Sequence, residues 1–429
     1  MQVLVTVTAI VFAIATVTAT AIVRIVAIAT TAIVRIAAIV RIVWIVRIAI
    51  APSLIVIVLI AFAMITIAIA RMATIATTGM DAPMIDFDFK TGWLTLNRTC
   101  NLRCKWCYAR DTEYKSSLTM SKDLAFELID FFDSINVKHI ILIGGEPTIH
   151  PDFFEILEYA KEKKIKCALV TNGLMFNNDE FIDKYKSVGM NSVSLSLKGE
   201  DEKTYKEITG FDGFQETIDI IKKLVSSDIS VSVSMVLTEN NMNSFTDVIP
   251  TLLNAGVKHF HFSFCYDFNL CGVKKDIFSP ISLLEMFGNI YEKLNSLTNG
   301  HFTLQNGLPL CYWDKTLLRK MIKRRQISTV CQLLTRKGLI FDSEGYHIPC
   351  NAMYALKLGK FGENFRDPSS FKQYLNSEVV QKTYQKLCGV PDENCLHCNK
   401  LVHCGGGCVC QYTNYKLKDY LVKQNKTQE

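Results

Sequence analysis

The stretch that decides the fold is Cys100-Asn-Leu-Arg-Cys104-Lys-Trp-Cys107, which places three thiols within eight residues. It directly follows a strand-like run, Trp93-Leu-Thr-Leu-Asn97, so we expect the thiols on a loop at the end of a strand. Thiols spaced this closely can face one iron–sulfur cube, whose irons usually take four Cys ligands. No fourth Cys lies nearby, since the next is Cys167. One iron would therefore keep an open position for substrate chemistry, as in catalytic zinc sites; the alternatives are a zinc site or unrelated thiols.

A second motif, Gly144-Gly145-Glu146-Pro147, follows the next strand-like run at residues 139–143. Its glycines let the backbone come close to a ligand, and Glu146 can accept a hydrogen bond from an ammonium group. A plain Gly-Gly turn that closes a strand is the alternative. Cys-x3-Cys-x-aromatic-Cys, with Trp106 as the aromatic, followed by this motif resembles the radical S-adenosylmethionine (radical SAM) enzymes over roughly residues 86–412.

The resemblance implies a mechanism and its cofactors. In that family the open iron of a 4Fe–4S cluster, here on Cys100, Cys104 and Cys107, chelates the methionine end of SAM. One-electron reduction by an external donor of the flavodoxin or ferredoxin type cleaves SAM reductively, and the 5′-deoxyadenosyl radical abstracts hydrogen from a substrate. Ser194-Leu-Ser196-Leu-Lys198-Gly199 resembles the family's ribose-binding strand, although Lys198 replaces an acid. The residues implied in cofactor binding are Trp106, Gly144, Gly145, Glu146, Pro147, Ser196 and Lys198. Asn172, which follows the third strand, is a further candidate for cofactor binding or else a turn residue.

Strand-like and amphipathic helix-like segments alternate from Lys90 onward. This alternation is typical of parallel strands joined by right-handed crossovers, and six units instead of eight indicate an incomplete barrel. We expect an α/β fold, which the resemblance specifies as a partial (β/α)6 barrel followed by a small cysteine-rich auxiliary iron–sulfur domain. The predicted strands are 93–97, 139–143, 167–171, 192–197, 230–237 and 259–264, and the predicted helices are 121–135, 153–163, 180–188, 214–226 and 244–255.

The sixth strand alternates His259 and His261 on one face with phenylalanines on the other. Ligands of parallel α/β sheets bind at the carboxyl ends of the strands. We therefore take His261, Tyr266 and Asp267 as candidates for catalytic contact with the substrate, although a structural role is the commoner one for a strand histidine.

The last third of the chain is rich in cysteine. Cys-x2-Cys pairs suit structural zinc, but the whole series resembles the SPASM extension of radical SAM enzymes, which holds two auxiliary iron–sulfur clusters. The resemblance implies one cluster on Cys331, Cys350 and Cys408, and another on Cys395, Cys398 and Cys404. The SPASM motif has a seventh thiol further along the chain, and no Cys follows Cys410 here. Either Cys410 is a ligand, or the second cluster has a non-Cys ligand, or the second cluster is incomplete. Cys311 and Cys388 are further thiols that could complete a site or stay inert.

The resemblance implies an enzyme that modifies a peptide or protein side chain, because SPASM proteins mostly act on peptides. Asn351 stands where sulfatase-maturing members carry an Asp that acts as the base. An amide cannot accept the proton, so formylglycine formation is not expected. No separate leader-peptide domain is evident at the N-terminus. The alternatives are radical oxidation of a small molecule, such as a sugar or a tetrapyrrole precursor, and a non-catalytic iron–sulfur electron carrier, which has no use for an open iron.

The N-terminal segment differs from the remainder of the chain. Residues 1–78 contain no Asp, Glu, Lys or Gly and repeat Ile-Val-Arg-Ile four times. Two charge-free runs are long enough to span a membrane, so residues 1–79 are a membrane anchor, a targeting segment or, as we favour, a translated simple repeat that precedes a start at Met80 or Met84. We expect domains at 1–79, 86–300 and 301–429.

Charge and cysteine usage bear on partners and compartment. Five arginines in the N-terminal segment supply most of the formal charge of +6, and the remainder has 42 basic and 41 acidic side chains. This balance gives no support to nucleic-acid binding. Fifteen cysteines in a chain of this size, clustered at metal-ligand spacings, indicate a reducing and oxygen-poor cytoplasm instead of a secreted disulfide scaffold.

Overall fold

The computed structural model describes residues 86–265, 280–329, 331–390 and 392–410. The predicted N-terminal segment and two of the catalytic candidates, Tyr266 and Asp267, lie outside these residues. Among the described helices, none has both the length and the apolar composition that crossing a membrane requires. From Ile85 onward the chain forms one compact unit.

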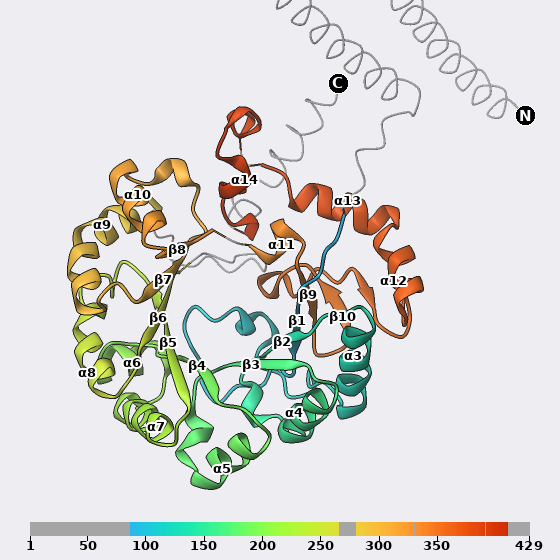
Figure 1. The fold of residues 1–429 in the computed structure, drawn as a ribbon, viewed down its shortest axis with the longest axis horizontal. Helices are drawn as coiled ribbons and strands as arrows, with labels where there is room; N and C mark the ends of the chain where they lie inside the picture. Colours follow the sequence, from blue (N-terminus) through green and yellow to red (C-terminus); the bar gives the residue numbers. More distant parts are fainter. Residues whose placement is uncertain (1–85, 266–279, 330, 391, 411–429) are drawn as a thin grey trace, which may run out of the picture. The chain divides into compact units, whose positions relative to one another are not determined.

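Eight parallel strands follow one another in chain order and curve into an incomplete ring, with helices on its outside (Figure 1). The six predicted strands are all present, three with the predicted bounds, which confirms the alternation read from the sequence. The strands are β1 Thr91–Thr95, β2 His139–Ile143, β3 Lys166–Thr171, β4 Ser192–Ser196, β5 Ser230–Leu237, β6 His259–Phe264, β7 Phe302–Gln305 and β8 Ile327–Ser328.

The C-terminal third adds three more strands to the same sheet. They are β9 Gly338–Phe341, β10 Tyr346–Ile348 and β11 Gly359–Lys360. β9 pairs in parallel with β1, and β10 and β11 continue antiparallel beyond it. The strand that leads into Cys100 is therefore held between β2 and β9. The predicted boundary at 300/301 remains a prediction, and the sheet continues across it.

The five predicted helices are present, with α8 shortened by a preceding 3₁₀ turn. Side-chain caps start several of them where polar residues precede an apolar stripe: Ser121 accepts from the amide of Leu124, and Asp201 accepts from that of Thr204. The helices are α3 Lys122–Ser134, α4 Phe153–Glu162, α5 Asp179–Ser187, α6 Glu202–Thr209, α7 Phe214–Ser226, α8 Ile249–Asn254, α9 Pro280–Leu297, α10 Lys315–Lys323, α11 Gln332–Thr335, α12 Pro368–Leu375, α13 Glu378–Leu387 and α14 Leu401–Cys404.

The main core lies between the sheet and its helices. On β6, Phe260, Phe262 and Phe264 are buried, whereas His259 and His261 are exposed on the opposite face, which confirms the predicted alternation. Phe264 meets Phe287 of α9 edge-on, with ring centroids 5.8 Å apart. The inner face of the ring is thereby left to polar side chains.

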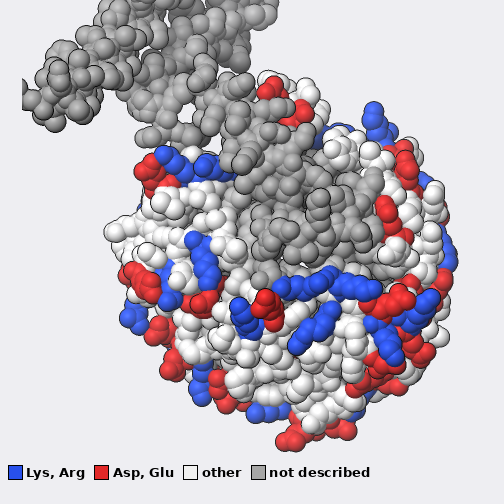
Figure 2. Space-filling model, turned by 180° about the vertical axis from the view of Figure 1, so that it is seen from behind, with Lys and Arg blue, Asp and Glu red and all other residues white. Residues whose placement is uncertain are grey.

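The charged side chains of the surface are mixed in sign. On the face shown in Figure 2, acidic and basic residues are interspersed over most of the described surface, and several basic side chains lie side by side near its middle. This mixture agrees with the near balance of acids and bases outside the N-terminal segment.

Candidate active site

The loop after β1 is folded onto the end of α6. The amides of Arg103 and Lys105 donate to the carbonyls of Thr209 and Ile208 at 3.0 and 2.9 Å. Cys100 and Cys104 are buried in a small apolar cluster with Leu102 and Ile208, against which Trp106 and Cys107 pack. The loop thus presents its three thiols from a fixed backbone. Thr209, to which the sequence assigns no role, has a structural one.

The three thiols of this loop form the radical site, defined here as Cys100, Cys104 and Cys107. Burial raises the pKa of the Cys100 thiol to about 12, and the charges of Glu146 and the two neighbouring thiols add to that increase. Burial likewise raises the pKa of Cys104, opposed by nearby Lys198. Packed thiols that resist ionisation release their protons when a cation takes the charge, so this set fits a metal cluster.

Backbone amides also donate to these sulfurs. The amides of Leu102 and Ala109 lie 3.3 Å from the sulfurs of Cys100 and Cys107. Such bonds stabilise thiolates and tune the potential of an iron–sulfur centre. Within the described residues, no three His, Cys, Asp or Glu side chains converge as ligands of a single ion would. The irons of a cube take their ligands at separate corners, so this result does not bear on a cluster.

The Gly-Gly-Glu-Pro motif closes on the same loop. The amides of Gly145 and Glu146 donate to the carbonyls of Asn97 and Thr99 at 2.7 and 2.8 Å. A Cβ on Gly144 would lie 2.6 Å from the carbonyl oxygen of Asn97. The close approach that these glycines allow is therefore to the chain's own backbone ahead of Cys100, and not only to a ligand as the sequence suggests.

Glu146 joins the carboxyl ends of β2 and β3. Its Oε1 accepts from the hydroxyls of Thr148 and Thr171, both at 2.6 Å, and from the amide of Thr148. Its Oε2 accepts from the amide of Asn172 at 2.7 Å. Burial raises the pKa of this carboxyl, and these hydrogen bonds oppose the increase. Since each carboxylate oxygen has about two acceptor positions, Oε2 keeps one for an ammonium donor.

The remaining cofactor candidates lie at neighbouring strand ends. The Asn172 amide donates to the side chain of Asn101 at 2.6 Å and lies 4.0 Å from the Cys100 sulfur. Pro147 is buried at the start of the turn that follows Glu146. Ser196, at the end of β4, shares a hydrogen bond of 3.2 Å with Ser234. The structure therefore brings Glu146, Asn172 and Lys198 together around the three thiols.

His261 belongs to a different opening. It lines a pocket of about 200 Å³ together with His259, His301, Arg324 and Arg325. His259 and His301 stand at the amino ends of β6 and β7, which is the end of the barrel opposite the cysteine loop. Burial lowers the pKa of His261, and the charge of His259 lowers it further. His261 itself lies within β6, in register with Ser234 of β5, which pairs with Ser196 of β4, and its catalytic role stays a prediction.

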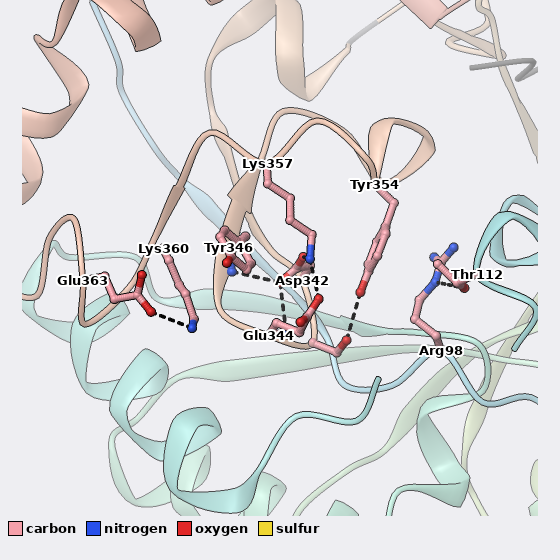
Figure 3. Close-up of polar contacts among 10 residues, drawn as sticks. Arg98, Thr112, Asp342, Glu344, Tyr346, Tyr354, Lys357, Lys360 and Glu363 are labelled. Carbon is pink, nitrogen blue, oxygen red and sulfur yellow. Dashed lines mark hydrogen bonds and ion pairs between the residues drawn. The ribbon is translucent and has the colours of Figure 1, made fainter. Parts of the chain in front are cut away.

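Sequence reasoning missed a polar network that links the cysteine loop to the region before Cys350 (Figure 3). The Arg98 guanidinium donates to Thr112 at 2.9 Å and stacks on the ring of Tyr354, 4.2 Å from its centroid. The hydroxyl of Tyr354 shares a hydrogen bond with Ser343, next to the buried Asp342 that pairs with Lys357 at 3.5 Å. No local motif marks the link between the two regions, because Arg98 and Tyr354 are 256 positions apart in the sequence.

Glu200 is a second residue without a sequence signal. It follows the ribose-like strand, is only 9% exposed, and accepts from the Ser244 hydroxyl at 2.6 Å. Burial raises the pKa of its carboxyl. Through Ser244 it ties the end of β4 to the segment after β5, where Thr238 and Asn241 bond to each other.

Four C-terminal thiols form the inner thiol group, defined as Cys331, Cys350, Cys408 and Cys410. The Cys410 thiol, 1% exposed, lies within hydrogen-bonding reach of Cys350 and Cys408. Burial raises the pKa of Cys331 to about 12, and Cys408 and Cys350 add to the increase. The structure thus places Cys410 beside the first predicted auxiliary ligand set.

The other predicted set, Cys395, Cys398 and Cys404, lies on a short exposed segment that ends in α14. The amides of Cys398 and Cys404 donate to the carbonyls of Cys395 and Lys400, so the segment turns tightly. Gly405, Gly406 and Gly407 follow with φ of 58°, 79° and 93°, a left-handed run that glycine adopts without strain. This run separates Cys404 from Cys408 of the inner thiol group.

The fold and the site together define an iron–sulfur enzyme with a partial α/β barrel. The comparison with protein families agrees, since residues 94–263 match the model of the Radical SAM superfamily. This match covers the radical site and the Gly-Gly-Glu-Pro motif. Residues 94–263 therefore carry a radical SAM domain, and this family implies a 4Fe–4S cluster and SAM as cofactors.

Two curated proteins of similar sequence have different named activities. The chain is 26% identical over 202 residues to a probable GTP 3′,8-cyclase of Sulfurisphaera tokodaii, covering 47% of this chain and 63% of the relative. It is 29% identical over 167 residues to an AdoMet-dependent heme synthase of Nitratidesulfovibrio vulgaris, covering 39% and 45%. The chain therefore matches less than two thirds of the length of either protein.

Among solved structures, SuiB of Streptococcus suis bound to its precursor peptide SuiA superposes with a TM-score of 0.60 at 15% identity. The match covers 81% of this chain and 78% of SuiB. SuiB has also been solved with S-adenosylmethionine. At this identity the likeness shows the shared fold, which extends beyond the barrel into the C-terminal region.

Proposed function

We propose that this chain reductively cleaves SAM and uses the resulting radical to modify a peptide or protein side chain. The observation that carries the proposal is the convergence at the carboxyl ends of β1 to β4: three packed thiols, the free acceptor position of Glu146, and Asn172 and Lys198 beside them. A metal-bound cofactor with a charged amino-acid end fits this combination of soft ligands and polar contacts.

The residues have separable roles in this proposal. Cys100, Cys104 and Cys107 hold the cluster, and the amides that donate to two of these sulfurs orient the loop. Glu146 accepts from the methionine ammonium through Oε2, while Thr171 and Thr148 fix its Oε1. When bound, the reduced cluster and SAM supply a carbon radical able to abstract hydrogen. Trp106 packs against the apolar cluster that contains Cys100 and Cys104.

The C-terminal thiols are proposed as ligands of auxiliary iron–sulfur clusters in a SPASM-type region. In the inner thiol group, Cys410 lies within hydrogen-bonding reach of Cys350 and Cys408, and Cys331 interacts electrostatically with the same two thiols, which fits a four-Cys cluster. Such a cluster would take up the electron that a substrate radical must lose. Zinc is the competing occupant, and metal analysis distinguishes the two, because zinc gives no visible chromophore.

A peptide substrate is supported by the fold match to SuiB, which binds the precursor peptide SuiA and shares the C-terminal region as well as the barrel. Asn351 accepts from the hydroxyl of Thr95 at 3.4 Å, beside the carboxyl end of β1. An amide there cannot act as a base, so formylglycine formation is not part of the proposal.

Small-molecule oxidation is the second candidate. The curated relatives named above are a GTP cyclase and a heme synthase, whose named substrates and products are not peptides. Assays with a nucleotide, a tetrapyrrole precursor and a peptide library would separate the two candidates once SAM cleavage is established.

The first experiment measures 5′-deoxyadenosine. The full chain, reconstituted anaerobically with iron and sulfide, is given SAM and a strong reductant. Formation that disappears in Cys107→Ala would support the proposal. Absence of formation from protein with its full iron content would favour the non-catalytic electron carrier. The same preparation tests whether a flavodoxin or ferredoxin replaces the chemical reductant.

A further inference from the structure

The outer set of predicted ligands has three thiols and lacks a fourth in the family's pattern. Cys410 lies against Cys350 and Cys408 of the inner thiol group, so it is not the fourth ligand of Cys395, Cys398 and Cys404.

The segment at 307–311 runs beside this set. The amide of Cys408 donates to the carbonyl of Gly307 at 2.6 Å, and the amide of Leu310 donates to the sulfur of Cys404 at 3.3 Å. These two bonds hold the segment against the chain between Cys404 and Cys408. Cys311 comes directly after Leu310, in the 3₁₀ turn Leu310–Tyr312.

The Cys311 thiol is in electrostatic contact with the same set. It interacts with Cys404 and Cys398, and Cys395 interacts in turn with Cys311 and Cys404. Thiols from two segments distant in the sequence thus lie close together, next to the bond between the Leu310 amide and the Cys404 sulfur.

Other nearby groups fit the position less well. The Oδ1 of Asp392 accepts from the amide and side chain of Asn394, so it is engaged in capping the turn at 393–397. The Cys388 thiol donates to the carbonyl of Leu333 and lies near the guanidinium of Arg336, not near the outer set of thiols. Thiolate is also the ligand that iron–sulfur clusters prefer.

We propose that Cys311 is the fourth ligand of the outer auxiliary cluster, completing with Cys395, Cys398 and Cys404 an outer thiol group supplied from upstream of the SPASM-like series. This inference rests on the proposed function, because it assumes that the auxiliary sites hold iron. It makes both C-terminal sites four-thiol sites, with Cys410 in the inner thiol group.

The test compares the iron and sulfide content and the Mössbauer and EPR spectra of four proteins: the full chain, Cys311→Ser, Cys398→Ser and the matched control Cys388→Ser. All are reconstituted anaerobically. Three 4Fe clusters are expected in the full chain, so losing one removes about a third of the iron. We expect Cys311→Ser and Cys398→Ser to lose that third or to show a three-iron signal, and Cys388→Ser to retain the full content.

The outcomes separate the inference from the proposed function. If Cys398→Ser loses a cluster and Cys311→Ser keeps all three with unchanged spectra, the assignment of Cys311 is overturned and the proposed function stands. If neither variant loses iron, or if the site holds zinc, the auxiliary cluster itself is overturned. Misfolding is monitored by the radical-site cluster, which a folded Cys311→Ser retains with its full yield of 5′-deoxyadenosine. A Cys311→Ser, Cys398→Ser double variant that loses no more iron than either single variant would support one shared cluster.

Discussion

The cysteines of this chain lie in two kinds of surroundings. The radical site and the inner thiol group are the more enclosed, since Cys100, Cys104 and Cys410 are buried. The outer thiol group is open, with Cys311 and Cys398 exposed on short turns. The same ligand type is thus presented at two levels of burial within one unit of the chain.

The difference teaches what burial does to a cluster site. An enclosed site disfavours the extra negative charge of a reduced cluster, whereas water at an exposed site stabilises it. We therefore expect the outer cluster to be reduced at a less negative potential than the inner one. The open site also gives an external electron donor direct access, whereas the enclosed sites restrict access to their own substrates.

The largest effect is expected when a ligand of the enclosed radical site is removed, compared with removal of a ligand from the outer thiol group. Cys104→Ala should reduce 5′-deoxyadenosine formation to the detection limit, because an incomplete ligand set does not hold the cluster. Cys398→Ala should leave that formation within about twofold and stop substrate turnover. Chromatography of anaerobic reactions measures both. Cleavage that survives Cys104→Ala would remove the active-site assignment, and full turnover in Cys398→Ala would make the outer cluster dispensable.

The second effect tests the buried carboxylate of Glu146 beside the radical site. Glu146→Ala removes a buried acceptor and leaves Thr171 and the Asn172 amide without their partner. We expect the free energy of unfolding to fall by about 2–4 kcal/mol, together with weaker SAM binding. Denaturant unfolding and calorimetric titration measure the two quantities. Leu253→Ala, at a partly exposed position on α8, is the control and should change neither substantially. Unchanged SAM affinity in a folded Glu146→Ala would refute its contact with the ammonium.

A third effect is the pH dependence of stability that the buried His347 causes. His347, fully buried next to the hydroxyls of Tyr374 and Tyr384, has its pKa lowered to about 3 by burial. The unfolded chain binds a proton near pH 6.5 and the folded chain does not, so stability falls as pH drops below that value, by about 1.4 kcal/mol per unit. Unfolding measured from pH 7 to 5 should show this slope, and His347→Gln should flatten it. An equal slope in both proteins would exclude His347 as its source.

The smallest effect compares the two auxiliary sites directly. An iron chelator should remove iron from the outer thiol group roughly tenfold faster than from the inner one, a ratio that about 1.4 kcal/mol in opening free energy produces. Cys311→Ser should lack the fast phase, which would assign that phase to iron released from the outer thiol group. A single rate for all C-terminal iron would mean that exposure of the thiols does not govern release.

Local patterns in the sequence predicted most of the barrel and the ligand types. Period and spacing located β1 to β6 and the cysteine loop, because these signals lie within a few residues of each other. They missed α6, whose eight residues follow the ribose-like strand, and the short strands β7 and β8. The pairing of β9 with β1 and the stacking of Arg98 on Tyr354 join distant segments, and no local pattern specifies such partners.

The site shows the same limit. The glycines of the Gly-Gly-Glu-Pro motif were recognisable from sequence, but their tight contact with Asn97 and Thr99 required the fold. Cys311 lies 84 positions before Cys395, outside any ligand spacing, and only the crossing of the two segments brings it to the outer thiol group. The pocket that His261 lines with His301 and Arg324 was likewise not evident, because residue order along a strand does not reveal where a pocket opens.

The pairing of β9 with β1 has a consequence for how this chain folds. Thr91 of β1 pairs with Gly338, so one edge of the barrel is completed only by residues made nearly 250 positions later. Until the ribosome has released them, the strand that leads into the cysteine loop presents a row of unpaired amides and carbonyls, the kind of surface on which nascent chains aggregate. The late return of the chain also raises its contact order, which slows folding. A fragment ending after β8 would keep the whole SAM-binding loop and still be an aggregation hazard.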